Sequence, residues 1–233
     1  MSLTSLPSST FEFLKVLQSN NNREWFNANK PRYQTELAHV CSLADNIIAQ
    51  VSKFDVLEPT TGKKSLFRIY RDTRFSKDKT PYKHHFSGRM KRATAYRRGG
   101  YYFHFEPGGQ SVIAGGFWGP NSADIKRIRA EIAADPDTFR SLITAPDFVK
   151  TFGSLQGDQV KTAPKGYKKD HPAIDLLRYK QYLLVRHLSD EEVFADDLVD
   201  KVANIYQQMV PFFDYMSAVL TTDENGVPLE GLI

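Results

Sequence analysis

The chain has 233 residues, of which 41% are hydrophobic and 25% are charged. This composition is typical of globular proteins and excludes the fibrous and intrinsically disordered classes. The formal net charge is +4, from 31 basic and 27 acidic residues. No apolar run reaches the roughly 18 residues that a membrane-spanning helix needs, so we expect no membrane segment.

Cysteine usage points to a reducing compartment. Cys41 is the only cysteine, so the chain forms no internal disulfide, and it has no CxxC or Cys/His spacing of a structural zinc site. The N-terminal residues lack the basic stretch and apolar run of a secretory signal. We therefore expect a cytoplasmic protein, a monomer or weak homodimer, without metal or cofactor.

The first fifty residues predict two helices. Ser9 and Glu12 have the spacing of a capping box, which predicts a short helix that ends at residues 20–22, three asparagines. Pro31 suits the first turn of a longer helix, and apolar residues recur at spacings of three and four from there to Val51.

Between residues 65 and 118 the apolar period changes from helical to alternating, which is typical of strands. The turn at residues 107–109 contains two glycines and suits a hairpin. We expect strands at residues 66–70, 86–92, 100–106 and 111–118.

The next part of the chain predicts helices that begin near Asn121 and Asp135, and a short one over residues 147–152. Residues 153–172 lack periodicity and predict a long ordered loop, with a candidate strand at 159–162. Residues 182–188 predict a further strand.

Near the C-terminus, Ser189 and Glu192 form a second capping-box pattern. Apolar residues then recur at spacings of three and four over residues 198–219, which predicts one long helix. Pro211 removes a backbone hydrogen bond, so we expect a kink near Gln207.

These elements predict an α+β fold, in which an antiparallel sheet of about five or six strands is flanked by helices. Long N- and C-terminal helices are expected to pack on this sheet. We expect a single globular domain over residues 1–233, with short tails outside residues 10–220.

Positive charge is concentrated in the middle of the chain. Residues 62–98 contain thirteen lysines and arginines against two aspartates, whereas the rest of the chain has 18 basic and 25 acidic residues. Such asymmetry bears on the partners of a protein, not on its fold.

One segment within this basic region carries a family resemblance. The run RIYRDTRFSKDKTPYKHHF, residues 68–86, resembles the signature of domain of unknown function 2461. FEFL at residues 11–14, NNNREWF ending at Phe26, AGGFW at 114–118 and PKGYKKDHP at 164–172 also match that family. The resemblance covers nearly the whole chain and implies no activity or site residues, because the family has no established function.

The basic segment itself predicts an anion-binding function. Guanidinium groups bind phosphate or carboxylate oxygens in pairs, and lysines add positive charge. We expect a phosphate-bearing ligand or a polyanion to bind a set drawn from two basic segments: Arg68, Arg71, Arg74, Lys77, Lys79, Lys83, Lys165, Lys168 and His171. Whether the two segments meet is open. The alternatives are that Asp72 and Asp78 pair with the arginines and lock the loop, or that the charges form a solvated face. Nucleic acid is a candidate partner on charge alone, since no RNP, KH or zinc-finger pattern is present.

A second hypothesis is an enzyme that acts on an anionic substrate, with Asp72, His104 and Glu106 as acid–base candidates. His104 and Glu106 share one strand face, and with a distant histidine such as His171 or His187 they match a site of two histidines and one carboxylate. This loose spacing is common by chance, so we expect no metal. A third hypothesis is a structural or protein-interaction module. Walker, GxGxxG, GxSxG and HExxH motifs are absent.

Overall fold

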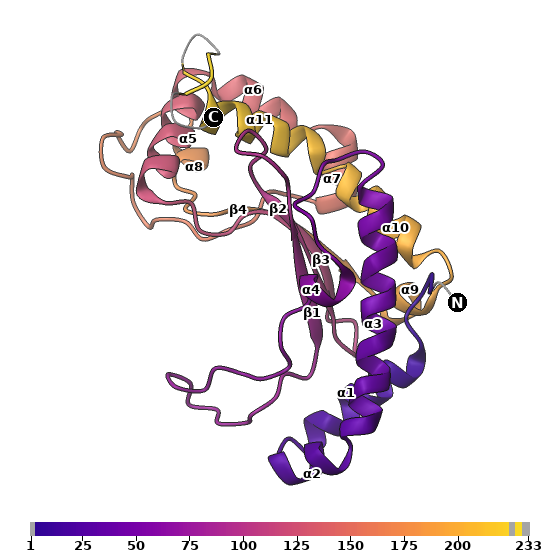
Figure 1. The fold of residues 1–233 in the computed structure, drawn as a ribbon. Helices are drawn as coiled ribbons and strands as arrows, with labels where there is room; N and C mark the ends of the chain where they lie inside the picture. The colour runs from indigo at the N-terminus through magenta and orange to yellow at the C-terminus, as the bar shows by residue number, and fades with distance from the viewer. Residues whose placement is uncertain (1–2, 224–226, 230–233) are drawn as a thin grey trace. The chain divides into compact units, whose positions relative to one another are not determined.

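The computed structural model describes residues 3–223 and 227–229 of the chain (Figure 1). The helices are α1 (Ser8–Ser19), α2 (Arg23–Ala28), α3 (Lys30–Val51), α4 (Gly62–Ser65), α5 (Ser122–Ala134), α6 (Pro136–Ile143), α7 (Pro146–Phe152), α8 (Ile174–Leu177), α9 (Asp190–Phe194), α10 (Leu198–Gln207) and α11 (Val210–Thr221). None of the helices in the described ranges has both the length and the apolar character needed to cross a lipid bilayer.

One open antiparallel sheet with helices around it confirms the α+β fold. Its strands, in the order β1-β2-β3-β4, are β1 (Phe86–Lys91), β2 (Gly100–Phe105), β3 (Ser111–Phe117) and β4 (Tyr182–Leu188). The expected count of five or six strands is wrong, because this sheet has four. Residues 66–70 and 159–162 form only isolated bridges, among them Gln159 with Tyr179.

A change of register explains why residues 66–70 do not form a continuous strand. Leu66 bridges Gly88, and Tyr70 bridges Tyr82. Four steps along the first segment therefore face six steps along the second, so the second segment carries two additional residues between the bridges. Such a bulge interrupts the ladder of hydrogen bonds and turns side chains in a new direction. The two consecutive histidines, 84 and 85, lie in this bulged stretch.

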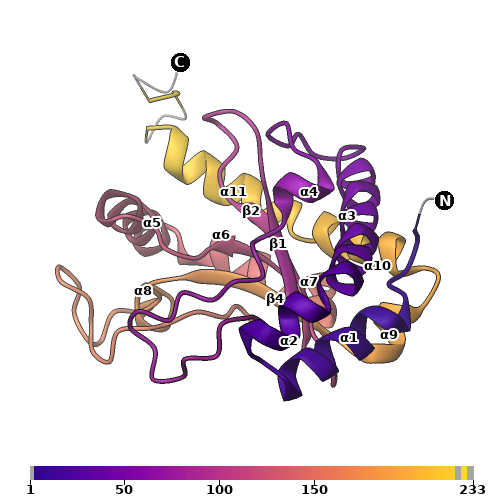
Figure 2. The same ribbon diagram turned by 60° about the horizontal axis from the view of Figure 1, so that its bottom comes forward.

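The chain divides into two compact units, and the first contains Met1–Met90, Tyr102–Ile113 and His187–Asn204. Here α1 and α2 both contact α3, as Figures 1 and 2 show. The hydroxyl groups of Ser9 and Thr10 donate to the buried carboxylate of Glu36 at 3.1 and 2.7 Å. The capping box predicted at Ser9 does not form, because α1 begins earlier, with Pro7 at its N-cap position, and Ser9 is the second residue of the helix.

The second unit contains Lys91–Tyr101, Ala114–Arg186 and Ile205–Ile233. In it, α11 contacts α5 and α6 (Figure 1). The Arg129 side chain links α5 to the C-terminal end of α8, because it donates to the carbonyl oxygens of Leu177 and Tyr179 at 2.8 and 3.0 Å. These contacts form a helical layer with an apolar core that includes Phe139 and Phe212.

The single long helix predicted near the C-terminus is wrong, because the segment forms α9, α10 and α11 in succession. The capping box of Ser189 and Glu192 is confirmed, but the helix that it opens, α9, has five residues. The expected kink near Gln207 is a complete break, since α10 ends at that residue and α11 begins at Val210 with Pro211 in its first turn. A proline there lacks the amide that would continue the preceding helix.

Gly116 offers a test of close packing in the second unit. Its φ is +135°, and a Cβ atom at this position would lie 2.2 Å from the carbonyl oxygen of Tyr182. We expect Gly116→Ala to lower the free energy of unfolding by about 2 kcal/mol or more, because the new methyl group meets backbone and the φ value suits only glycine. Urea unfolding followed by circular dichroism measures this change. The control is Gly119→Ala, since nothing lies within 4 Å of its added Cβ. Equal stability of the two variants would refute this account of Gly116.

Candidate functional site

The basic loop comprises residues 71–80 and belongs to the first unit. A short pairing of Tyr70 with Tyr82 closes the loop at its base. Its guanidinium groups are engaged within the loop. Arg71 donates to the carboxylate of Asp78 and to the hydroxyl of Thr80, and Arg74 donates to both oxygens of Asp72. The alternative that the two aspartates pair with the arginines therefore matches these contacts.

The loop carboxylates are correspondingly acidic. The Thr80 amide, the Arg71 guanidinium and the Thr80 hydroxyl lower the pKa of Asp78 to about 2. The hydrogen bonds from Arg74 lower the pKa of Asp72. Lys79 adds a further bond within the loop, because its ammonium donates to the carbonyl oxygen of Thr73 at 2.8 Å. Both carboxylates remain charged at neutral pH and hold the loop in one conformation.

Other cations of the basic segment have no carboxylate partner in the described part of the chain. Arg68 and Lys77 are exposed and take part in no ion pair there. Lys83 and Arg89 lie over the ring of Phe67, at 5.6 and 5.8 Å from its centroid. Burial, followed by the charge of Arg68, lowers the pKa of Lys83. Two cations therefore lie over Phe67, which is 41% exposed.

A histidine–glutamate cluster lies in the first unit, formed by His84, His85, His104 and Glu106. The carboxylate of Glu106 lies 2.6 Å from His104 Nε2, 2.9 Å from His84 Nε2 and 3.7 Å from His85 Nδ1. The rings of His85 and His104 stack with their centroids 4.0 Å apart. The bulge brings His84 and His85 to this place, and the alternation of β2 puts His104 and Glu106 on one face.

The protonation of the cluster follows from burial and from neighbouring cations. Burial, with smaller contributions from the charges of His104 and Lys83, lowers the pKa of His85 to about 3. Burial also lowers the pKa of His104, against the opposing effect of its hydrogen bond to Glu106. Both imidazoles are therefore neutral at pH 7, and each ring carries one lone pair on nitrogen. The Tyr102 hydroxyl lies 3.0 Å from His104 Nδ1 and orients that ring.

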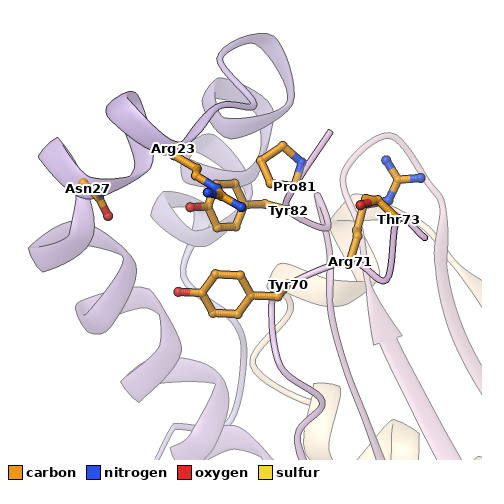
Figure 3. A pocket seen from close by; sticks show the side chains of 7 residues that line it. All are labelled: Arg23, Asn27, Tyr70, Arg71, Thr73, Pro81 and Tyr82. Atoms are coloured by element: carbon orange, nitrogen blue, oxygen red, sulfur yellow. The ribbon is translucent and has the colours of Figure 1, made fainter. Parts of the chain in front are cut away.

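A pocket of about 330 Å³ lies between α2 and the base of the loop (Figure 3). We call it the α2 pocket; its lining residues are Arg23, Asn27, Tyr70, Arg71, Thr73, Pro81 and Tyr82. The Tyr82 ring stacks on Phe26 at 4.0 Å, which fixes one wall. The Asn21 side chain holds the Tyr82 backbone at both its amide and its carbonyl, at 3.0 and 2.9 Å. The lining contains two arginines and no carboxylate.

The predicted residues fall into separate groups. His104 and Glu106 come together, whereas Asp72 lies in the exposed loop with Arg74 as its partner. Lys165, Lys168 and His171 belong to the second unit, where His171 Nδ1 accepts from the Ala173 amide at 3.1 Å. The second and third histidines of the cluster are His84 and His85, not the expected His171 or His187.

Sequence reasoning missed Arg23, Arg89, His84 and His85. Only the two histidines left a visible signal, as adjacent polar residues at the end of the basic motif. Arg23 and Arg89 gave none, because each lies outside the basic loop and is placed by tertiary contacts.

Fold and side chains together define an α+β protein with a self-paired basic loop, an acid-free pocket and a histidine–glutamate cluster. The chain belongs to the family of conserved hypothetical proteins known as domain of unknown function 2461, which it matches over residues 9–215. In the comparisons with curated proteins and with solved structures, nothing matches.

The internal bonds of the basic loop yield a prediction. Because the pKa of Asp78 is depressed below its ordinary value of 3.8 to about 2, its bonds to Arg71 and Thr80 are present at neutral pH. They are lost only as the pH falls through about 2. We expect Asp78→Ala to speed amide hydrogen exchange at Thr80 by at least about tenfold at pH 7, because that amide donates to Asp78.

The control for this measurement is Asp72→Ala, which releases Arg74 without touching Thr80. Amide exchange is read by mass spectrometry over residues 71–80. Equal exchange in the two variants and the unaltered protein would contradict the proposed lock.

Proposed function

We propose that this protein binds a small phosphate-bearing ligand in the α2 pocket of its first unit. The observation that carries the proposal is a cavity of about 330 Å³ with arginine in its wall and no carboxylate among its lining residues. This volume falls within the range of about 300–1,000 Å³ that small-molecule sites occupy.

Arg23 is the main anion-binding residue in this proposal. Its side chain has no carboxylate partner among the residues that the structure describes, whereas the guanidinium of Arg71 is held by Asp78 and Thr80. Figure 3 shows Arg23 beside the Tyr82 ring, with Asn27 on the same helix. A guanidinium free to offer two parallel N–H groups suits a phosphate group. Arg71, whose charge is paired with Asp78, forms one side of the wall.

The remaining lining residues suit an organic phosphate. Tyr70 is 59% exposed and presents its ring to the pocket, where it can stack on a planar group of the ligand. The Thr73 hydroxyl and the Asn27 amide add donors. A neighbouring cavity shares Arg23, Thr73 and Pro81 with the α2 pocket and extends along the loop to Lys79. Its lining also includes the carboxylate of Asp78, which repels phosphate, so the proposal is confined to the α2 pocket.

Ligand titration tests this proposal. Inorganic phosphate, pyrophosphate and nucleoside phosphates are titrated by calorimetry at low salt. We expect Arg23→Ala to raise Kd about tenfold to a hundredfold, since a hydrogen bond to a charged group contributes about 1.5–3 kcal/mol. Tyr70→Ala weakens the nucleoside phosphates and leaves inorganic phosphate unaffected.

Arg74→Ala is the matched control, because Arg74 is an exposed arginine of the loop that lines neither cavity. An unchanged Kd in Arg23→Ala, or an equal loss in both arginine variants, would contradict a local site in the α2 pocket. A polyanion is distinguished with a single-stranded oligonucleotide. If it contacts about five phosphates, log affinity falls with log salt at a slope of about −3.5.

A second candidate function is catalysis on an anionic substrate, favoured by the hydrogen-bonded chain from Tyr102 through His104 to Glu106. A neutral imidazole oriented on one nitrogen and bonded to a carboxylate on the other is an arrangement suited to acid–base work. The cations over Phe67 lie in the same unit and favour a negatively charged substrate.

Chromogenic phosphate monoesters and diesters test the catalytic function. We expect His104→Asn to lower kcat about a hundredfold with little change in KM, because general acid–base groups contribute about 10²–10⁴ in rate. His171→Gln is the control and retains full activity. Failure of both substrate classes to turn over, or an unaltered kcat in His104→Asn, would remove this candidate.

A further inference from the structure

Three donor groups of the histidine–glutamate cluster are close enough to share one ion. One nitrogen each from His85 and His104 and one oxygen of Glu106 lie within 4.8 Å of one another. Two ligands of one ion are about 3.0–3.5 Å apart, since each bond is about 2.1 Å long. Small side-chain rotations therefore suffice to bring the three donors onto a common centre. No other such group of donors occurs within residues 3–223 and 227–229.

We propose that His85, His104 and Glu106 form a binding site for a divalent transition-metal ion such as Zn²⁺ or Fe²⁺. Two imidazoles and one carboxylate are a donor set that such ions take, and three protein ligands leave coordination positions open. This site is separate from the α2 pocket, and it depends on neither the phosphate-binding nor the catalytic proposal.

The chemical state of the donors suits a cation. A neutral imidazole offers one nitrogen lone pair to a metal ion, and one nitrogen each of His85 and His104 faces the Glu106 carboxylate. Glu106 adds one negative charge. The three side chains are 15–22% exposed, which shields the donors from bulk water while leaving an entry path.

Two groups behind the donors orient them by hydrogen bonds on the side away from the ion, as in other metal sites. Tyr102 holds His104 Nδ1 at 3.0 Å, and its hydroxyl can accept from that nitrogen when Nε2 binds the ion. His84 holds Oε1 of Glu106 at 2.9 Å, which leaves Oε2 facing the two other histidines. Two of the three ligands, His104 and Glu106, are thus held by a bond on the side away from the shared centre.

Nearby positive charge sets the expected strength of the site. Lys83 and Arg71 both lower the pKa of His85, so their charges also oppose a bound cation. The charge of Arg71 is offset by Asp78, and the ammonium of Lys83 lies over the Phe67 ring. We therefore expect moderate affinity. A phosphate or carboxylate group of a ligand can then occupy the open coordination positions beside Lys83.

Metal titration tests the inference on the full, tag-free chain after chelator treatment and without any phosphate ligand. We expect one Zn²⁺ or Co²⁺ ion per chain, measured by calorimetry and by the visible absorption of Co²⁺. Glu106→Gln and His85→Asn raise Kd at least about a hundredfold, and Tyr102→Phe raises it about tenfold. His171→Gln is the control with unchanged Kd.

A measurement on the unaltered protein guards against variants that fail to fold. Bound Co²⁺ shifts the NMR signals of nearby histidine ring protons, and we expect shifted signals from His85 and His104 but not from His39 or His171. The inference is overturned if Zn²⁺, Co²⁺, Fe²⁺ and Mn²⁺ all fail to bind up to 1 mM (about −4 kcal/mol). Shifts at His39 or His171 in place of the cluster would overturn it equally. Because no phosphate ligand is present, these outcomes are independent of the α2 pocket.

Discussion

The half-buried carboxylate of Glu106 is the constraint around which the surface of the first unit is organised. A carboxylate removed from water is costly unless it is paired or accepts hydrogen bonds. Glu106, which directly follows β2, meets this requirement with two imidazole nitrogens, one from His104 in β2 and one from His84 in the segment before β1. The neighbouring Tyr102 extends the same chain of bonds. Loss of any one partner leaves a polar group of this chain unsatisfied, so these side chains act as one unit.

The bulge between the two bridges makes this arrangement possible. In an unbroken antiparallel pair, residues 82–88 would continue to alternate across the ladder, and adjacent histidines would point to opposite faces. Two additional residues break the alternation and let both His84 and His85 approach Glu106. The same bulge that interrupts the backbone hydrogen bonds therefore brings the two histidines to Glu106. Bulges of this kind are often found near functional sites.

Sequence patterns predicted the strands near residues 86–92, 100–106, 111–118 and 182–188. Burial alternates residue by residue in β2, whereas β1, β3 and β4 each contain a run of three buried residues. The pattern also predicted a strand at residues 66–70, where only isolated bridges form. How these residues align with their partner segment cannot be seen in their own sequence. The sequence showed the excess of cations in residues 62–98. It did not show which arginine pairs with Asp72 and which with Asp78, because the conformation of the loop decides this. His85 and Glu106 are 21 positions apart, a contact that no local pattern records. The helix start was predictable at Ser189, which is the N-cap residue of α9, and not at Ser9, because α1 already begins at Ser8 after Pro7.

The internal hydrogen bonds of the basic loop determine whether its conformational entropy is lost on folding or on ligand binding. A flexible basic loop must lose its conformational freedom when a ligand arrives, and that loss weakens binding. Here Arg71, Asp78 and Thr80 close the loop on itself, so its backbone is ordered when the chain folds. Arg71 and Thr73 of this internally bonded loop line the α2 pocket. A ligand of the kind proposed for that pocket would therefore meet a wall whose ordering has already been completed in folding.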